Sequence, residues 1–193
     1  MKKIGAYIGV FLSLFIIACE GPQGPPGFDG FDGEDGLNGL DAEQNRVFEI
    51  DNVNFNYNSE SNIFNTIITF SDFFNDNQFE VLPQDAVLVY RYDGTIDFAD
   101  GSSEDAWSLI PQSFFLNEGT IQYTNSHTSK DVQIFIDGNF NLANISTDFT
   151  DNQLFRVVLM PNRILEVSKL DTSNLEAVLD ALEMHKSDIR RIN

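Results

Sequence analysis

Residues 51–58 read Asp-Asn-Val-Asn-Phe-Asn-Tyr-Asn, in which polar and apolar side chains alternate from Asn52 onward. In an extended strand successive side chains point to opposite faces, so Val53, Phe55 and Tyr57 share one face. Further segments rich in β-branched and aromatic residues follow at 63–70, 87–92, 107–109, 113–116, 120–124, 132–136 and 154–160. This spacing predicts a mainly β domain over 45–193, either a single antiparallel β-sandwich or an open barrel.

Three of these segments are followed by an acidic residue and a glycine. The strand at 87–92 runs directly into Asp93-Gly94, a pair typical of a hairpin turn. Glu118-Gly119 and Asp137-Gly138 stand in similar places farther along. We therefore expect turns at these three pairs.

The hydrophobic period changes near the C-terminus. Four apolar residues recur at i, i+3, i+4 and i+7: Leu175, Val178, Leu179 and Leu182. The pattern predicts one helix over 174–185 that packs its apolar stripe on the sheet, capped by Asp171-Thr172-Ser173. Basic residues follow it, where they favour the negative end of a helix dipole: Lys186, Arg190 and Arg191. Residues 187–193 are expected to form a last turn or strand.

The first residues have the pattern of an export signal. Lys2 and Lys3 precede an apolar stretch at 4–17, which is shorter than the roughly 20 residues of a membrane-spanning helix. Ala18 then stands directly before Cys19, the one cysteine of the chain. The arrangement resembles the bacterial lipobox and predicts a signal peptide over 1–18 with lipid attached to Cys19. A single cysteine allows neither an intramolecular disulfide nor a cysteine-based metal site.

Residues 21–41 form seven uninterrupted Gly-x-y triplets, the collagen repeat. Only three of the 14 non-glycine positions are proline, and several triplets end in Asp without any Lys or Arg in the tract. This composition favours a monomeric spacer over 19–44, in which the tract at 21–41 spans on the order of 60 Å if extended, while a trimer is the alternative. The repeated Asp-Gly steps do not match the ligand spacing of an EF-hand.

Charge narrows the class of partner. The chain has 11 basic and 30 acidic side chains, and loss of Lys2 and Lys3 with the signal peptide leaves 9 and 30, a net charge of −21. Such a chain repels nucleic acid and anionic headgroups, so we expect no nucleic-acid partner and membrane affinity from the lipid alone. An acidic balance is compatible with Ca²⁺, with cationic peptides or with solubility.

One acidic segment is the weak candidate for a metal site. Its carboxylates could surround Ca²⁺, which takes six to eight oxygen ligands, or could form a glycosidase pair. These residues are Asp93, Asp97, Asp100, Glu104 and Asp105. The ordinary interpretation is a solvated loop. Aromatic residues that border the segment could form a sugar-binding platform or belong to the core: Tyr90, Tyr92, Phe98 and Trp107.

Catalytic motifs are missing from the sequence. It contains no P-loop, no dinucleotide-binding glycine motif, no Gly-x-Ser-x-Gly elbow and no His-Glu-x-x-His pair. His127 lies in a polar loop, where a general base would need a partner, and His185 is expected at the end of the helix. We predict no catalytic residue, no cofactor and no enzyme activity.

Two parts of the chain resemble a known family. Residues 19–27, Cys-Glu-Gly-Pro-Gln-Gly-Pro-Pro-Gly, resemble the start of collagen-like predicted lipoproteins of Gram-negative bacteria. Segments similar to the domain of those proteins lie at 107–112, 115–123, 132–140 and 152–158. The resemblance implies a lipid-anchored protein of the bacterial cell envelope, at the outer membrane, without an established activity.

We therefore expect a non-catalytic binding or structural domain that a collagen-like spacer presents at the cell envelope. One alternative is a tethered enzyme that acts on envelope or extracellular polysaccharide. Another is a trimeric adhesin-like surface protein. Whether the domain faces the periplasm or the cell surface is open at this point, as is its protein or glycan ligand.

Overall fold

The computed structural model describes residues 47–74, 81–162, 164 and 169–192. The predicted signal peptide, Cys19 and the Gly-x-y tract lie outside the described residues, as does the predicted domain boundary at residue 45.

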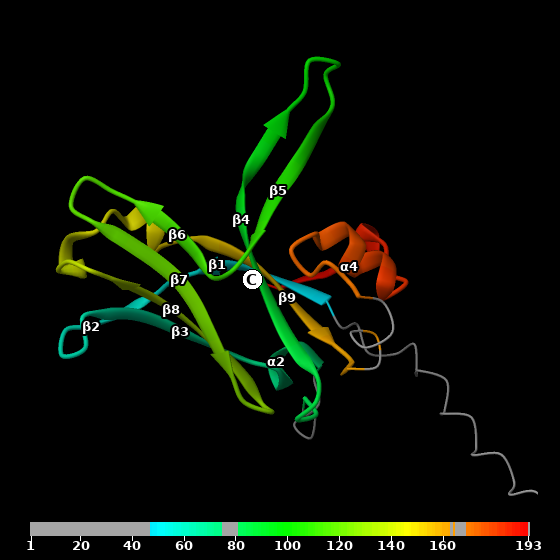
Figure 1. Cartoon of the computed structure of the whole chain (residues 1–193), viewed down its shortest axis with the longest axis horizontal. Helices are drawn as coiled ribbons and strands as arrows, with labels where there is room; N and C mark the ends of the chain where they lie inside the picture. Colours follow the sequence, from blue (N-terminus) through cyan, green and yellow to red (C-terminus); the bar gives the residue numbers. More distant parts are fainter. Residues whose placement is uncertain (1–46, 75–80, 163, 165–168, 193) are drawn as a thin grey trace, which may run out of the picture. The chain divides into compact units, whose positions relative to one another are not determined.

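Two five-stranded sheets form the described part of the chain (Figure 1). Sheet A has the order β10 (Arg190–Ile192), β1 (Val47–Val53), β9 (Gln153–Met160), β4 (Ala86–Asp97) and β5 (Ser103–Leu109). Sheet B has the order β2 (Asn56–Asn58), β3 (Ile63–Thr69), β8 (Asp131–Gly138), β7 (Thr120–His127) and β6 (Gln112–Phe115). The predicted mainly β fold is confirmed, as a sandwich and not as a closed barrel.

Short helical segments complete the described part: α2 (Ser71–Phe74), η1 (Leu142–Asn144), η2 (Thr147–Phe149), α4 (Leu175–Ala181) and η3 (Lys186–Asp188). All described strand ladders are antiparallel except one, because β10 runs parallel to β1. One parallel pair, at this edge of sheet A, thus stands in an otherwise antiparallel sandwich.

The alternating stretch at 51–58 passes from one sheet to the other. Val53 ends β1 in sheet A, and Tyr57 lies in β2 of sheet B. Between them the Phe55 amide donates to the Thr150 carbonyl at 2.8 Å. Val53 and Phe55 are buried in the core between the sheets, while Tyr57 is half-buried against it. The chain thus changes from sheet A to sheet B between Val53 and Tyr57, yet the apolar side chains on both sides of this change point into the same core.

Strand β9 lies at the centre of sheet A, with both faces covered. Phe155 and Val157 belong to the core between the sheets, whereas Val158 and Met160 pack beneath α4 on the outer face. This double burial explains why 154–160 reads as a nearly continuous apolar run rather than as an alternating strand. The described domain thereby has three layers: helix α4, sheet A and sheet B.

Helix α4 confirms the predicted C-terminal helix in a shorter form. It buries Leu175, Val178 and Leu179 but ends at Ala181. The cap is Asn174, whose side-chain oxygen accepts from the Ala177 amide at 3.2 Å, and not the preceding 171–173 segment.

The basic residues after α4 do not stabilise its end, contrary to our expectation. Lys186 reaches back to Glu176 in the first turn of the helix. Arg190 and Arg191 lie in β10, where Arg190 donates to the Phe73 carbonyl at 2.8 Å. The segment 187–193 contains both forms expected of it, a short turn followed by a strand.

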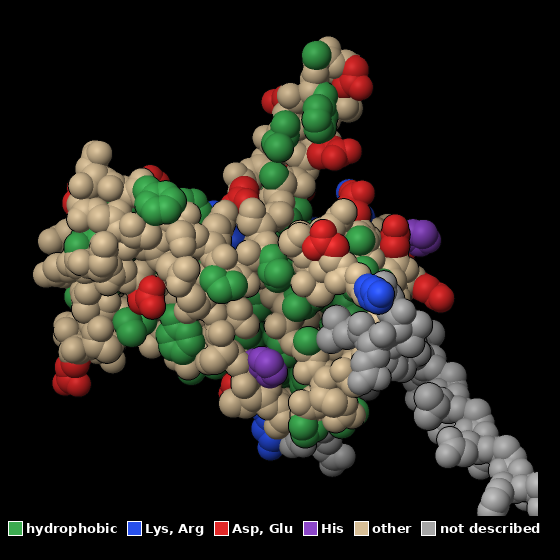
Figure 2. Space-filling view, in the orientation of Figure 1, with side chains coloured by type: hydrophobic (Ala, Val, Ile, Leu, Met, Phe, Trp, Pro, Cys, Tyr) green, Lys and Arg blue, Asp and Glu red, His purple; other side chains and the backbone are tan. Residues whose placement is uncertain are grey.

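Strands β4 and β5 continue past the body of sheet A as a two-stranded arm, residues 93–105, which projects away from the sandwich (Figure 1). Asp93-Gly94 is not a turn, because the ladder shifts register there and resumes with Gly94 opposite Ala106. Gly94 has φ of 120°, which a residue with a side chain rarely adopts, so it permits a β-bulge inside the strand. Apolar and acidic side chains are exposed together on the arm (Figure 2).

Candidate functional site

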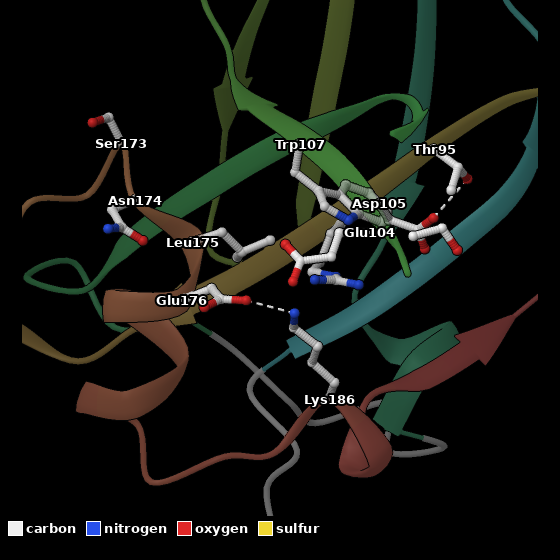
Figure 3. A pocket seen from close by; sticks show the side chains of 11 residues that line it. Thr95, Glu104, Asp105, Trp107, Ser173, Asn174, Leu175, Glu176 and Lys186 are labelled. Atoms are coloured by element: carbon white, nitrogen blue, oxygen red, sulfur yellow. Dashed lines mark hydrogen bonds and ion pairs between the residues drawn. The ribbon is translucent and has the colours of Figure 1, made fainter. Parts of the chain in front are cut away.

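A cleft of about 620 Å³ lies over the part of the outer face of sheet A that α4 leaves uncovered (Figure 3). The arm forms one wall with Thr95 and residues 103–105. Residues 173–176 and Lys186 form the other wall. Trp107 and Arg156 also line the cleft, from β5 and β9. Three regions that are distant in the sequence, 95–107, 156 and 173–186, therefore meet here.

Arg156 is the central charged residue of the cleft. Its guanidinium lies 4.0 Å from the centre of the Trp107 ring and donates through Nη2 to Glu49. Glu49 also accepts from Arg191 Nε at 3.0 Å. Because Glu49 stands directly opposite both arginines in the ladders of β1, one carboxylate joins three neighbouring strands. Arg156 Nε, however, is buried and has no hydrogen-bond partner among the described residues.

Hydrogen bonds between side chains hold the arm wall. The Thr95 hydroxyl donates to Asp105 at 2.9 Å, so the 2.6 Å contact between Tyr92 and Thr95 has the tyrosine as donor. The Tyr92 ring also packs against Trp107, with 5.4 Å between the ring centres. This chain of contacts fixes one carboxylate of the cleft.

The helix wall carries an ion pair. Lys186 Nζ lies 2.5 Å from Glu176, and this hydrogen bond, with the lysine charge, lowers the pKa of the Glu176 carboxyl. Below the wall, the Tyr90 hydroxyl donates to the Thr172 carbonyl at 2.5 Å and ties the start of the helix to β4. Burial, followed by the charge of Asp171, raises the pKa of Tyr90 well above its usual value.

The five carboxylates proposed for Ca²⁺ do not converge. Asp100 closes the tip of the arm by accepting from the amide and hydroxyl of Ser102, hydrogen bonds that lower its pKa. Glu104 and Asp105 face the cleft, and Asp93 belongs to a separate polar network. Asp97 lies in β4 of the arm. In the described ranges no group of three or more His, Cys, Asp or Glu side chains is placed to hold a metal ion.

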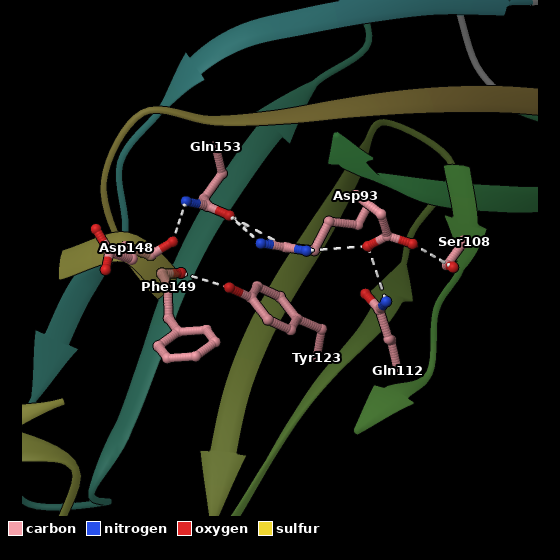
Figure 4. A network of polar contacts seen from close by, with 8 residues as sticks. Asp93, Ser108, Gln112, Tyr123, Asp148, Phe149 and Gln153 are labelled. Carbon is pink, nitrogen blue, oxygen red and sulfur yellow. Dashed lines mark hydrogen bonds and ion pairs between the residues drawn. The ribbon is translucent and has the colours of Figure 1, made fainter. Parts of the chain in front are cut away.

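The polar network around Asp93 joins the two sheets (Figure 4). Asp93 accepts from Arg91 at 3.1 Å, from Ser108 at 2.5 Å and from Gln112 at 2.9 Å. Arg91 also donates twice to Gln153, at 2.9 and 3.2 Å. These residues come from β4, β5, β6 and β9, so the network has a structural role.

Two aromatic rings enclose Arg91. Its guanidinium carbon lies 5.1 Å from the centre of the Phe114 ring and 5.0 Å from that of Tyr123. The Tyr123 hydroxyl donates to the Phe149 carbonyl at 2.5 Å. Burial raises the pKa of Tyr123 to about 12, although the charge of Arg91 opposes the shift.

The aromatic residues and histidines named from the sequence occupy different places. Tyr90 is fully buried, Phe98 is exposed at the tip of the arm, and Tyr92 packs with Trp107, so these four rings do not form one platform. His127 ends β7 and is exposed. His185 precedes η3, where its backbone amide donates to Asp188 at 3.1 Å.

Sequence reasoning missed Arg156 and its partners Glu49 and Arg191. One signal was available, since Arg156 is the single charged residue in the apolar run 154–160. A charge on a strand that is buried on both faces requires a partner, but its identity depends on strand order.

No protein family model, curated protein or solved structure that was compared with the chain matches it. Among the described residues, no helix is both long and apolar enough to cross a membrane.

Proposed function

We propose that the chain is a lipid-anchored protein of the bacterial cell envelope, held at the outer membrane through Cys19 and extended from it by the Gly-x-y spacer. Its β-sandwich serves as a non-catalytic binding module. The anchor is supported by the apolar segment that ends in Ala18-Cys19, and the spacer by the seven triplets that follow. The binding role is supported by the cleft between the arm and α4.

The charged side chains of the cleft indicate which class of ligand it binds. Five charged side chains line it: Glu104, Asp105, Glu176, Arg156 and Lys186. Both cations are paired within the protein, Lys186 with Glu176 and Arg156 with Glu49, a carboxylate that Arg191 shares. With Glu49 and Arg191 counted, the cleft and its ion pairs hold four acidic and three basic side chains, an excess of one negative charge. A ligand that presents a cationic group complements this excess, and the acidic chain as a whole attracts it at long range.

Tetralysine is a suitable model ligand. Trp107 is the only tryptophan of the chain and lies in the cleft, so its fluorescence reports occupancy directly. We expect tetralysine to change this fluorescence in the full chain held in neutral detergent. Glu104→Gln should weaken binding about fivefold, or ~1 kcal/mol for a partly exposed ion pair. Glu60→Gln, the same charge change in an exposed turn, is the matched control and should leave affinity within about twofold.

Equal weakening by Glu104→Gln and Glu60→Gln would show attraction to net charge alone and would reject the cleft as the site. Release of sugars from envelope polysaccharide by the purified chain would favour the tethered enzyme instead. A threefold mass in sedimentation would favour the trimeric adhesin-like protein.

The anchor has a separate test. Cys19→Ala should abolish labelling with radioactive fatty acid and release the protein from the membrane fraction. Labelling that persists in this variant would contradict the proposed anchor without affecting the cleft.

A further inference from the structure

A second groove lies at the other end of the sandwich. It has a volume of about 740 Å³ and is formed where the β6–β7 turn meets the loop that carries η1 and η2. Strand β1 begins at Val47, the first described residue, and ends at Val53 near the groove. Along this strand Val47 pairs with Val158 and Val53 with Gln153. Phe149 of the groove immediately precedes Thr150, which is bonded to Phe55 just beyond β1. The groove and Val47 are therefore separated by the length of β1, about 20 Å.

The lining of this groove differs from that of the cleft. Three phenylalanines contribute to it: Phe115, Phe140 and Phe149. Phe115 is 86% exposed, an unusual position for a large apolar side chain. Asn117 and Asn144 also line the groove, and Glu118 is the one charged residue among the described residues that line it. In so acidic a chain, this surface is nearly neutral.

Hydrogen bonds hold the groove in shape before any ligand binds. The Asn62 side chain donates to the Phe140 carbonyl and accepts from the Leu142 amide, both at 2.8 Å. Asn139 accepts from the Thr120 amide at 2.9 Å, which joins the same loop to β7. A fixed wall reduces the entropy lost on binding, so a weakly interacting ligand can still be retained.

We propose that this distal groove, the surface between the β6–β7 turn and the η1–η2 loop, binds a neutral glycan. Flat aromatic rings pack against the apolar faces of sugar rings, while asparagine amides can both donate to and accept from hydroxyl groups. An anionic polymer would be repelled by the acidic chain, and a second copy of the chain would be repelled for the same reason. A neutral polymer with many hydroxyl groups meets neither obstacle.

Three neutral polysaccharides serve as test ligands: a soluble mannan, a β-glucan and a galactan. We expect at least one to bind the full chain in calorimetric titration. Phe115→Ala should weaken that binding about tenfold, as expected for loss of an aromatic anchor. Its melting temperature should stay unchanged because the side chain is almost fully exposed. Ile67→Ala is the matched control, because Ile67 is 61% exposed on β3 of the same sheet and outside the groove.

Competition separates this groove from the cleft. Saturating tetralysine and the Glu104→Gln substitution should leave glycan binding unchanged, and glycan should leave Trp107 fluorescence unchanged. Displacement of glycan by tetralysine would place it in the cleft and overturn the proposal. So would normal glycan binding by Phe115→Ala, or no binding of any of the three polysaccharides at millimolar sugar concentration. Self-association that Phe115→Ala abolishes, without glycan binding, would identify a contact between copies instead.

Discussion

Replacing Glu49 with glutamine should destabilise the domain far more than removing the exposed arginine that shares its carboxylate. Side-chain exposure is 6% for Arg156, 12% for Glu49 and 52% for Arg191. Glu49→Gln keeps an oxygen that can accept from Arg156 but removes the negative charge, and leaving a buried charge uncompensated in this way costs about 3–5 kcal/mol. Arg191→Gln breaks a solvent-screened pair and should cost at most about 1 kcal/mol.

A double variant makes the reasoning quantitative. Glu49→Gln combined with Arg156→Met removes the unpaired cation and places a methionine against Trp107, so it should recover at least about 2 kcal/mol relative to Glu49→Gln alone. Urea unfolding followed by far-UV circular dichroism measures each free energy of unfolding, provided that the m-value is constant. A double variant less stable than Glu49→Gln would refute the argument, as would an Arg191→Gln variant as unstable as Glu49→Gln.

Three single residues and the acidic segment each give a further prediction. Burial raises the pKa of Tyr123 from 10 to about 12, so its contribution to the free energy of unfolding is intact below pH 10 and is lost as the pH rises toward 12. Urea unfolding at stepped alkaline pH should show the free energy of unfolding fall by about 2–3 kcal/mol over this range. Gly119→Ala should cost about 1–3 kcal/mol in urea unfolding, because its Cβ would lie 2.2 Å from Asn139 Oδ1; a cost below about 0.5 kcal/mol would show that Asn139 moves aside freely. Asp93→Ala should lower stability by about 2–3 kcal/mol through loss of its hydrogen bonds to Arg91 and its neighbours. Millimolar Ca²⁺ should leave the melting temperature of the unaltered chain unchanged, and a clear rise would restore the calcium interpretation.

The fold was largely predictable from side-chain periodicity, whereas strand order was not. Alternation places Val53 and Phe55 on the buried face whether or not the strand continues, so their burial survives a change of sheet. Asp93-Gly94 misleads because a tight hairpin turn and a bulge of this kind both place a glycine at positive φ, and a glycine after an acidic residue suits either. The pairing of β10 with β1 depends on contacts across 142 residues, which no local pattern specifies.

The candidate site was only partly visible in the sequence. Glu104, Asp105 and Trp107 were found because acidic and aromatic residues cluster in one short segment. Arg156 and Lys186 join them through the fold, from strands and turns far along the chain. Phe115 shows the same limit, since two adjacent phenylalanines must face opposite sides of a strand and composition does not say which one remains exposed.

The position of β1 has a consequence for the order of events during synthesis. It is the first of the described strands to leave the ribosome, yet its two neighbours in sheet A are β9 and β10. Glu49 is separated from its partners by 107 and 142 residues. Sheet A therefore cannot close until β9 and β10 have been made, whereas β6, β7 and β8 can pair as soon as they emerge. Under the export that we propose, this delay keeps the domain unfolded for longer, because β10 is made after every other described strand.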